Sequence, residues 1–383
     1  MIQTAIVCGA GIVSGKEIMA LELGEGLRAR GRSVNYITSL WGDGDFSVRL
    51  EALGFPFRRM RLGFISAALS LDCLRMTADQ LCHWPGLVRD YRRFLHEENP
   101  RHIIHTNWHH LLLLRPWLRP ERDLLWLHEV VPDKPQYVRV FGWLAKRLRC
   151  FIGVSEAVAE SLRRIGIPAA QIQVIRNGLT DPSAGLPARP ALGTGGNIGI
   201  VGQVGVWKGH QDLVEAFALI AGRHPEARLH IFGPAEREFA DCLKQRAATL
   251  GLAARLVWHG FVRDRAKIYP VMDICAVPSR SADPLPTTAI EAAFFGLPVV
   301  ATRRGGLPEI IDDGVTGYLV EAERPQELAQ RLEELLGSVE LRERMGGAAR
   351  LRARQHFSRE RFVGEFLRVL SAGEEVSQAS IES

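Results

Sequence analysis

Short apolar runs alternate with longer amphipathic stretches along most of this chain, a pattern typical of α/β folds with parallel strands. In the first half, the apolar runs predict strands at residues 5–8, 34–38, 57–60, 102–105, 124–128, 150–154 and 173–175. The rhythm restarts in the second half, with strands expected at residues 198–201, 228–232, 256–259, 274–277 and 298–301. The pattern therefore predicts two α/β domains in succession.

Three of the amphipathic stretches show a helical period. The stretch GKEIMALELGEGLRARG predicts a helix that ends at Gly31, with a face made of Ile18, Leu21, Glu22, Glu25 and Leu27. The stretch HQDLVEAFALIAG places on one face Leu213, Phe217 and Ile220. Near the end of the chain, SRERFVGEFLRVL repeats Phe362, Phe366, Leu367 and Leu370.

A segment rich in Pro, Gly and Ala, TDPSAGLPARPALGTGG at residues 180–196, has no period and predicts a linker. The 383 residues exceed one ordinary core, which agrees with two domains. We expect an N-terminal Rossmann-like domain over 1–185, a C-terminal one over 186–355, and a helix with a polar tail over 356–383. Ligands are expected in an interdomain cleft, at the carboxyl ends of the strands.

Composition narrows the class of protein. Hydrophobic residues make up 46% and charged residues 24%, as in soluble globular proteins, and no run of about 18 apolar residues predicts a membrane span. The first residues lack the pattern of a signal peptide. Six scattered cysteines without a C-x-x-C pair argue against a zinc site or a disulfide framework. These features predict a cytoplasmic protein.

Charge is unevenly distributed between the two halves. Residues 1–185 contain 24 Lys and Arg against 18 Asp and Glu, whereas the remainder contains 24 against 25. A basic first half fits binding to an anionic membrane surface or to an anionic substrate. The alternative is that the excess of arginine reflects overall composition and has no functional meaning. Only six lysines occur, so a lysine at a special position is informative.

One such lysine follows the first strand of the second half, in NIGIVGQVGVWKGHQDLVEAF. The strand ends at Gly202, a helix begins near His210, and Lys208 and Gly209 stand at the entrance of that helix. Free N–H groups and the positive end of the helix dipole suit a phosphate there. A solvated loop lysine is the alternative.

An acidic residue, Glu291, lies among apolar neighbours in DPLPTTAIEAAFFG, where a buried carboxylate needs a polar partner. Pro284 and Pro286 stiffen the preceding loop, and Thr287 and Thr288 can cap the helix. No cation lies one turn away in either direction. The expected partner is a pair of vicinal hydroxyls such as a ribose offers, with an arginine from another helix as the alternative.

Two further loops follow predicted strands. In RRGGLPEIIDDGVTGYLV, Gly305 and Gly306 permit close approach of a ligand before another helix begins. In VWHGFVRD the strand ends at Gly260, and Phe261 and Val262 can flank a flat base. A buried core phenylalanine is the alternative for Phe261.

Taken together, five segments in order resemble the GT-B glycosyltransferases of family GT4: IQVIRNG, GQVGVWKGHQDLVEAF, HGFV, DPLPTTAIEAAFFGLPVVA and GGLPEIIDDGVTGYLV. The resemblance implies a GT-B fold and a nucleotide-sugar donor. It implies that Lys208 grips the diphosphate, Glu291 holds the ribose and Asp283 stands near the transferred sugar. The implied donor site consists of Gly202, Gln203, Lys208, Gly260, Phe261, Val262, Asp283, Pro284, Leu285, Pro286, Thr287, Thr288 and Glu291.

The first half resembles the same family in SGKEIMALELGEGLRARG, HIIHTNW, LLWLHEVVP and FIGVSEAVAESL. The implied acceptor side consists of Ser14, Gly15, Glu17, His105, Asn107 and His128. Catalytic roles fall to His128, Asp283 and Lys208. The final helix is expected to cross back to the first domain.

There are departures from the family pattern. Gln203 stands where the family often has arginine, so one diphosphate cation is missing, and Arg280, Arg303 or Arg304 are candidates to replace it. Asp283 stands where the family has glutamate, which shortens its reach.

A cluster of histidines and a long apolar run allow further interpretations. His102, His105, His109 and His110 cluster in sequence but lack a helical ligand spacing, so no metal is expected. The run HHLLLLRPWLRPERDLLWL predicts a buried helix and strand, with peripheral membrane association as the alternative.

The sequence thus predicts a retaining hexosyltransferase-like enzyme of polysaccharide or glycan biosynthesis, without cofactor or nucleic-acid partner. The donor is a UDP-, GDP- or ADP-sugar, and the acceptor a saccharide or lipid-linked saccharide. A nucleotide-sugar epimerase or hydrolase and a non-catalytic sugar-nucleotide-binding protein remain alternatives. A Rossmann dehydrogenase is disfavoured because CGAGIVSG lacks the third glycine at the right spacing.

Overall fold

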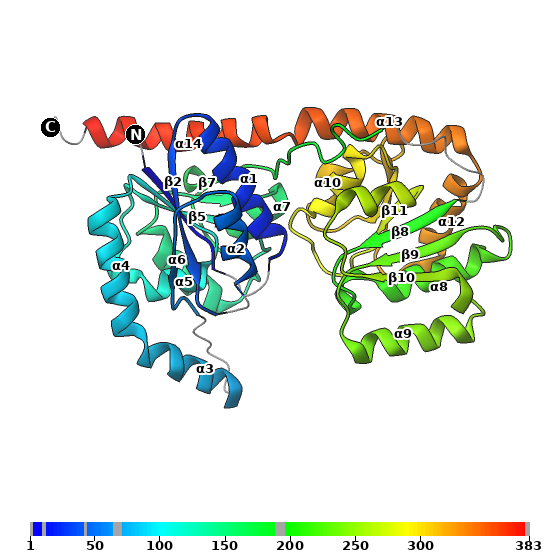
Figure 1. Cartoon of the computed structure of the whole chain (residues 1–383), viewed down its shortest axis with the longest axis horizontal. Helices are drawn as coiled ribbons and strands as arrows, with labels where there is room; N and C mark the ends of the chain where they lie inside the picture. The colour runs from blue at the N-terminus through cyan, green and yellow to red at the C-terminus, as the bar shows by residue number, and fades with distance from the viewer. Residues whose placement is uncertain (1–2, 10–12, 42–43, 64–70, 188–195, 380–383) are drawn as a thin grey trace. The chain divides into compact units, whose positions relative to one another are not determined.

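The computed structural model describes residues 3–9, 13–41, 44–63, 71–187 and 196–379 (Figure 1). Contacts divide the chain into two compact units. Unit 1 contains Met1–Gly178 and Arg359–Ser383, and unit 2 contains Leu179–Ser358. The start of the expected linker is ordered within unit 2, where the Ser183 hydroxyl donates to the carbonyl of Phe294 at 3.1 Å. Its residues 188–195 lie outside the described part of the chain.

Unit 1 is built on a seven-stranded parallel sheet with the order β3-β2-β1-β4-β5-β6-β7. Its strands are β1 (Gln3–Val7), β2 (Ser33–Ser39), β3 (Phe57–Met60), β4 (His102–His105), β5 (Asp123–Leu127), β6 (Phe151–Gly153) and β7 (Ile172–Val174). All seven expected strands are confirmed, with ends shifted by at most two residues. Short apolar runs therefore marked most of the sheet, as expected for strands covered on both faces, whereas the edge strand β3 contains Arg58 and Arg59 and is only partly buried.

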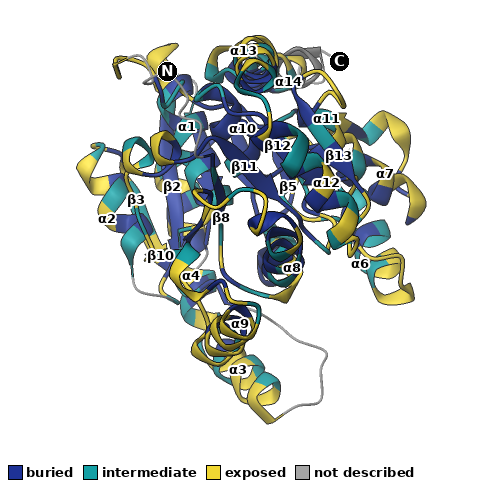
Figure 2. Cartoon of the chain, turned by 90° about the vertical axis from the view of Figure 1, so that its right-hand side faces the viewer, coloured by how far each residue is buried: buried dark blue, intermediate teal, exposed yellow. Residues whose placement is uncertain are grey.

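The helical elements of unit 1 connect these strands. They are α1 (Gly15–Ala29), α2 (Asp45–Ala52), α3 (Leu71–Cys82), α4 (Trp84–Glu98), α5 (Trp108–Leu113), η1 (Arg115–Trp117), α6 (Pro135–Ala145), α7 (Glu156–Arg164), η2 (Ala169–Gln171) and α14 (Arg359–Ala379). Figure 2 shows the strands β2 and β5 as buried and most of α3 as exposed.

The buried face of α1 differs from the predicted one. Met19, Leu23 and Leu27 are buried, whereas Ile18, Leu21, Glu22 and Glu25 are only partly covered. Two glycines explain the difference: a Cβ on Gly24 would overlap the Tyr36 hydroxyl, and one on Gly26 would overlap the Val363 side chain. Neighbouring elements therefore approach α1 along its glycines, a contact that hydrophobic periodicity alone does not register.

The last helix, α14, packs on unit 1. Phe362, Phe366 and Leu370 are buried as predicted, while Leu367 is only partly covered. The ring of Phe366 meets that of Trp126 in β5 at a centroid distance of 5.0 Å. Arg149 Nη2 donates to the carbonyl of Val369 at 2.6 Å.

Unit 2 contains a six-stranded parallel sheet with the order β10-β9-β8-β11-β12-β13. Its strands are β8 (Asn197–Val201), β9 (Arg228–Phe232), β10 (Leu256–Gly260), β11 (Ile274–Val277), β12 (Val299–Thr302) and β13 (Gly317–Val320). The first five were predicted, and β13 was not. Strand order reverses direction between β8 and β11, which makes their carboxyl ends the topological switch point, the usual ligand position in such sheets.

The helical elements of unit 2 are η3 (Val206–Lys208), α8 (His210–Ala221), α9 (Arg237–Thr249), η4 (Ala253–Arg255), η5 (Arg265–Lys267), η6 (Tyr269–Val271), α10 (Thr287–Phe294), α11 (Leu307–Ile310), α12 (Pro325–Leu336) and α13 (Val339–His356). Leu213, Phe217 and Ile220 of α8 are buried in the core, as predicted. No helix within the described ranges is long and apolar enough to cross a membrane.

Candidate functional site

Glycines close the carboxyl ends of the first three strands of unit 2. Gly202, Gly233 and Gly260 all have positive φ angles, of 149°, 143° and 65°. The Gly233 amide donates to the Gly260 carbonyl at 2.8 Å, and a Cβ on Gly233 would overlap the Gly202 carbonyl. Gly233 was not among the predicted site residues, although its place directly after the strand at 228–232 was the available signal.

Lys208 lies at the switch point, on η3 and directly before α8. Gly209 between them has φ of 73°, and a Cβ there would overlap the carbonyl of Pro278, so the loops after β8 and β11 touch. The ammonium lies 4.3 Å from the centre of the Trp207 ring and forms an ion pair with Asp283. The lysine is therefore held in place and is not a freely solvated loop residue.

Asp283, in the loop after β11, is buried and is the ion-pair partner of Lys208. The Gly306 amide donates to the Asp283 carbonyl at 2.8 Å. A Cβ on Gly305 would overlap the Asp283 backbone, and one on Gly306 would overlap that of Pro284. In the structure, the close approach that these glycines permit is made by the protein backbone, which brings the loops after β8, β11 and β12 together.

Helix α10 begins beside this ion pair, and its capping differs from the prediction. The N-cap residue is Pro286, and neither Thr287 nor Thr288 caps the helix with its hydroxyl, because both already lie inside the first turn. The Thr288 hydroxyl is buried and has no hydrogen-bond partner in the part of the chain that the structure describes. The first N–H groups of a helix have no acceptor within it, so this end can receive an anion.

The chain itself supplies partners for Glu291. Its carboxylate accepts a hydrogen bond from the Tyr269 hydroxyl at 2.7 Å and lies 3.0 Å from Arg265 Nη2. Glu291 is 5% exposed, and burial together with its charge raises the pKa of Tyr269 well above the usual value. The alternative of an arginine from another segment is thus what the structure contains. The burial of Glu291 therefore needs no ligand, and its contact with a ribose stays a prediction.

The remaining donor candidates differ in exposure. Phe261 is 63% exposed, so the alternative of a buried core phenylalanine is wrong. Val262 and Pro284 are partly covered, Gln203 is exposed, and Leu285 and Pro286 are buried. The buried pair can offer only backbone to a ligand.

The three arginines that could replace the missing cation differ in whether a carboxylate already binds them. Arg280 bonds the Asp212 carboxylate at 2.7 Å, and Arg303 bonds Asp313 at 2.8 Å. Arg304 is exposed and has no side-chain partner among the described residues. Of the three arginines, Arg304 is therefore the available cation, and it directly precedes Gly305, which approaches the Asp283 backbone.

In unit 1, the predicted loop after β1 is organised by Glu17. The Ser14 amide and hydroxyl both donate to Glu17 Oε2, at 2.9 and 2.5 Å, at the start of α1, whose first residue is Gly15. Glu17 is completely buried, and burial together with its charge raises the pKa of Cys8 to about 12. Glu17 therefore caps its own helix instead of facing solvent.

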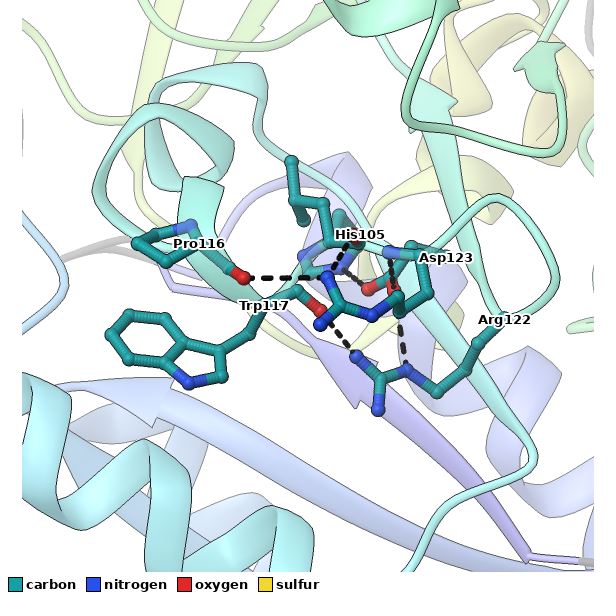
Figure 3. Close-up of polar contacts among 7 residues, drawn as sticks. His105, Pro116, Trp117, Arg122 and Asp123 are labelled. Carbon is teal, nitrogen blue, oxygen red and sulfur yellow. Dashed lines mark hydrogen bonds and ion pairs between the residues drawn. The ribbon is translucent and has the colours of Figure 1, made fainter.

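His105, expected on the acceptor side, is buried in unit 1. Its Nε2 lies 2.7 Å from Asp123 Oδ1, while the other oxygen of Asp123 accepts from Arg122 Nε at 3.2 Å and from the Arg119 amide at 2.9 Å (Figure 3). Both side chains of the His105–Asp123 pair are 0% exposed. The expected contact between His105 and an acceptor is therefore not supported, because the carboxylate holds the ring inside the fold. Asn107 caps α5, with Oδ1 accepting the His109 amide at 3.0 Å.

His128 follows β5 and is half-buried, with its Nε2 atom lacking a hydrogen-bond partner within the described residues. Burial, and secondarily the charge of Lys16, lower the pKa of His128 well below its ordinary value. The imidazole is therefore neutral near pH 7 and free to form a hydrogen bond.

Lys16 was not among the predicted site residues. Its charge also contributes to lowering the pKa of His109, to about 4, and that of His110, after burial as the main cause. The lysine thus lies near the ends of β1, β4 and β5. Its rarity in this sequence was the signal that could have found it. Across the described ranges, no three His, Cys, Asp or Glu side chains are grouped to hold a metal ion.

Two family models match the chain. Residues 192–352 match the glycosyl transferases group 1 model, and residues 14–178 match the glycosyl transferase 4-like domain. Together with the parallel sheets of both units, these matches show that the chain belongs to the GT4 family of glycosyltransferases, which have the GT-B fold. The predicted family and fold class are confirmed.

Relatives and solved structures agree with this assignment. A D-inositol 3-phosphate glycosyltransferase from Rhodococcus jostii is 27% identical over 86% of this chain and 78% of its own length. Spore coat protein SA from Bacillus subtilis is 31% identical over 44% of this chain, and the match spans 47% of that protein. Anabaena HepE, solved with UDP and glucose, has a TM-score of 0.79 at 22% identity, covering 97% of this chain and all of HepE. At that identity, HepE supports the fold alone.

Proposed function

We propose that this protein is a retaining glycosyltransferase that moves a sugar from a nucleotide-sugar donor to a saccharide or lipid-linked saccharide acceptor. The observation that carries the proposal is the Lys208–Asp283 ion pair at the switch point of unit 2, next to the starts of α8 and α10. A lysine and two helix N-termini together form a positive site for a diphosphate leaving group.

Each residue then has a defined task. The donor diphosphate replaces Asp283 as the partner of Lys208, and the amides at the start of α10, with the Thr288 hydroxyl, bind its oxygens. Asp283 is released to bind a hydroxyl of the transferred sugar. The exposed ring of Phe261 packs on the base beside Val262 and Gly260, and Gly202 and Gln203 line the phosphates. Glu291 accepts ribose hydroxyls while Arg265 and Tyr269 hold it in place.

The acceptor side is assigned to unit 1. The neutral His128 ring can donate to or accept from a sugar hydroxyl. Ser14 and Asn107 are the N-cap residues at the starts of α1 and α5, and Lys16 lies in the first turn of α1. The incoming hydroxyl attacks on the face from which the diphosphate leaves, so the configuration at the anomeric carbon is retained. No metal is required when Lys208 and the helix ends stabilise the leaving charge.

A nucleotide-sugar donor is part of the proposal, and a protein of the same fold suggests which donor to test first. The Rhodococcus protein is named as a glycosyltransferase, and HepE was solved with UDP and with UDP-glucose. UDP-glucose is therefore the first donor to test. We place the enzyme on the cytoplasmic face of the cell membrane, in glycan or polysaccharide biosynthesis, because its first half is basic and a lipid-linked acceptor would be presented there.

The test is incubation of the chain with UDP-, GDP- and ADP-sugars, with and without saccharide and lipid-linked acceptors. Release of nucleotide that depends on the acceptor, with an unchanged anomeric configuration by NMR and no loss of turnover in EDTA, supports the proposal. Acceptor-independent release or a new donor epimer would instead favour a hydrolase or an epimerase. Nucleotide binding without any turnover would favour a binding protein.

A further inference from the structure

An apolar groove of about 540 Å³ lies in unit 1, and none of its lining residues belongs to the proposed donor or acceptor site. It runs between the α3–α4 junction, the end of α5 and the outer part of α6. Leucines and a valine share the lining with Trp84 and Trp143, and two arginines, Arg115 and Arg139, complete it. Its size is that of a site for a small organic group.

The groove has fixed walls. Trp84 Nε1 donates to the carbonyl of Leu113 at 3.0 Å, which ties the start of α4 to the end of α5. On the opposite side, the Arg147 guanidinium covers the Trp143 ring at 4.2 Å. Leu113 itself belongs to the buried core of unit 1. The opening is therefore held by core packing on one side and by α6 on the other.

The charged part of the lining is unneutralised. Arg115 and Arg139 are both exposed, and neither has an ion-pair or hydrogen-bond partner in the part of the chain that the structure describes. The surrounding segment, residues 71–149, carries 13 Lys and Arg against nine Asp and Glu, which accounts for most of the positive excess of the first half. An apolar groove with two free cations matches an amphiphile that has an anionic head.

The surface beside the groove is apolar as well. Leu81 of the lining is 54% exposed, and Val138, next to Arg139, is 41% exposed. On α3, Leu71 and Leu74 are 73% and 47% exposed, and Figure 2 shows this helix largely uncovered. Leucine, tryptophan and arginine on one surface are the combination found where helices lie in the headgroup region of a bilayer.

We propose that this groove takes an acyl chain of an anionic phospholipid, with the lipid phosphate between Arg115 and Arg139 and the exposed side chains of α3 and α6 in the headgroup layer. The inference gives a site to the membrane location proposed above and is independent of the identity of donor and acceptor. A membrane lipid fits better than the tail of a soluble amphiphile because the apolar surface continues from the groove onto α3.

The first experiment is sedimentation of the full chain with phosphatidylcholine vesicles that contain or lack phosphatidylglycerol. We expect binding only to the anionic vesicles. The Arg115→Gln/Arg139→Gln variant should bind them roughly thirtyfold more weakly, from the loss of two cations near an anionic surface. A matched Arg237→Gln/Arg263→Gln variant, which removes two exposed cations from unit 2, should bind like wild type.

The second experiment tests the groove itself. Phosphatidylglycerol with brominated acyl chains should quench tryptophan fluorescence, and Trp143→Phe should remove a large part of that quenching. Trp207→Phe in unit 2 is the control and should leave it unchanged. Absence of vesicle binding, equal binding by the Arg115/Arg139 variant, or quenching unaffected by Trp143→Phe would each overturn the proposal. Quenching by a lipid-linked acceptor but not by phosphatidylglycerol would also overturn it and assign the groove to the substrate. UDP titration and the donor panel on the same preparations report separately on the proposed function.

Discussion

At the scale of single residues, the ion pair between Lys208 and Asp283 places an anion in the proposed donor site. In the proposed function, Asp283 pairs with the partly buried ammonium of Lys208 until a diphosphate, which carries more negative charge than a carboxylate, replaces it. The proposal therefore predicts that Asp283 weakens nucleotide binding, that Lys208 strengthens it, and that both residues are needed for transfer. This opposition makes their variants distinguishable.

Lys208→Ala should lower turnover by about 30- to 1,000-fold, the effect of losing one positioned electrostatic group worth about 2–4 kcal/mol. It should also weaken binding of UDP in calorimetry. Asp283→Asn should lower turnover too, yet bind UDP at least as tightly as wild type, because the competing carboxylate is gone. Lys244→Ala, at an exposed lysine of α9, is the control. Wild-type turnover in Lys208→Ala would remove the lysine from the mechanism.

Glu291 combines a structural role with its proposed contact with a ribose, because Arg265 and Tyr269 already bond its carboxylate. Glu291→Gln should lower the free energy of unfolding of unit 2 by about 1–3 kcal/mol through weakened charged hydrogen bonds. It should also raise the dissociation constant for UDP while leaving that for 2′,3′-dideoxy-UDP unchanged. Urea unfolding and calorimetry measure the two effects. If wild type binds UDP and the dideoxy analogue equally, Glu291 serves only the fold.

The sequence predicted that Glu291 is buried but not what binds it. Burial could be inferred from neighbours within one turn of α10. Arg265 and Tyr269 come from the separate 3-10 helices η5 and η6, and nothing periodic in RDRAKIYP marks them as partners. Contacts between distant segments depend on tertiary packing, which a single sequence encodes only indirectly.

At the scale of elements, strands were predicted more accurately than helix faces. A fully covered parallel strand is apolar throughout, so its position survives a shift in register. Which face of a helix is buried depends on the elements that pack against it. In α1 the buried face includes the glycines, against which Tyr36 and Val363 pack. The start of α10 also depends on its surroundings, because its N-cap is Pro286 and not a threonine. Strand β13 (GYLV) was missed although strands of the same length were predicted, and its Tyr318 is partly exposed.

The glycine-rich strand ends make a prediction at this scale. Gly233→Ala should destabilise unit 2 by about 1–3 kcal/mol, because a Cβ would overlap the Gly202 carbonyl and φ is 143°. The shifted Gly202 loop should weaken UDP binding as well. Gly222→Ala, at the end of α8 with open space and φ of −65°, should be neutral or slightly stabilising. Urea unfolding that finds the two variants equally stable would show that the loop relaxes freely.

At the scale of the whole molecule, buried histidines in both units make stability depend on pH. His110 in unit 1 and His210 in unit 2 are buried, and burial lowers the pKa of both, that of His210 to about 4. Unfolded histidine titrates near pH 6.5, so the unfolded state binds more protons and stability falls as the pH drops below that value. At about pH 5 each such histidine should cost about 2 kcal/mol.

Urea unfolding near pH 7 and near pH 5 measures this loss. In His210→Asn the difference between the two conditions should shrink for unit 2, whereas His96→Gln, at an exposed position of α4, should leave it as in wild type. If His210→Asn and wild type lose the same free energy of unfolding between pH 7 and pH 5, the loss comes from carboxylates and not from His210.

The proposed assignment of the donor to unit 2 and of the acceptor to unit 1 gives the last prediction. Lys208, Asp283 and Glu291 all belong to unit 2, while His128 belongs to unit 1 and its buried Nε2 has no partner among the described residues. His128→Ala should therefore bind UDP as wild type does but lose most transfer to the acceptor, because a neutral imidazole no longer aligns a sugar hydroxyl. Calorimetry with UDP and a transfer assay on one preparation separate the two activities. His128→Gln, which keeps a hydrogen-bonding side chain, should recover part of the transfer, and His96→Ala is the surface control. Intact transfer in His128→Ala would leave the residue a structural one, while lost UDP binding would contradict the assignment of donor and acceptor to separate units.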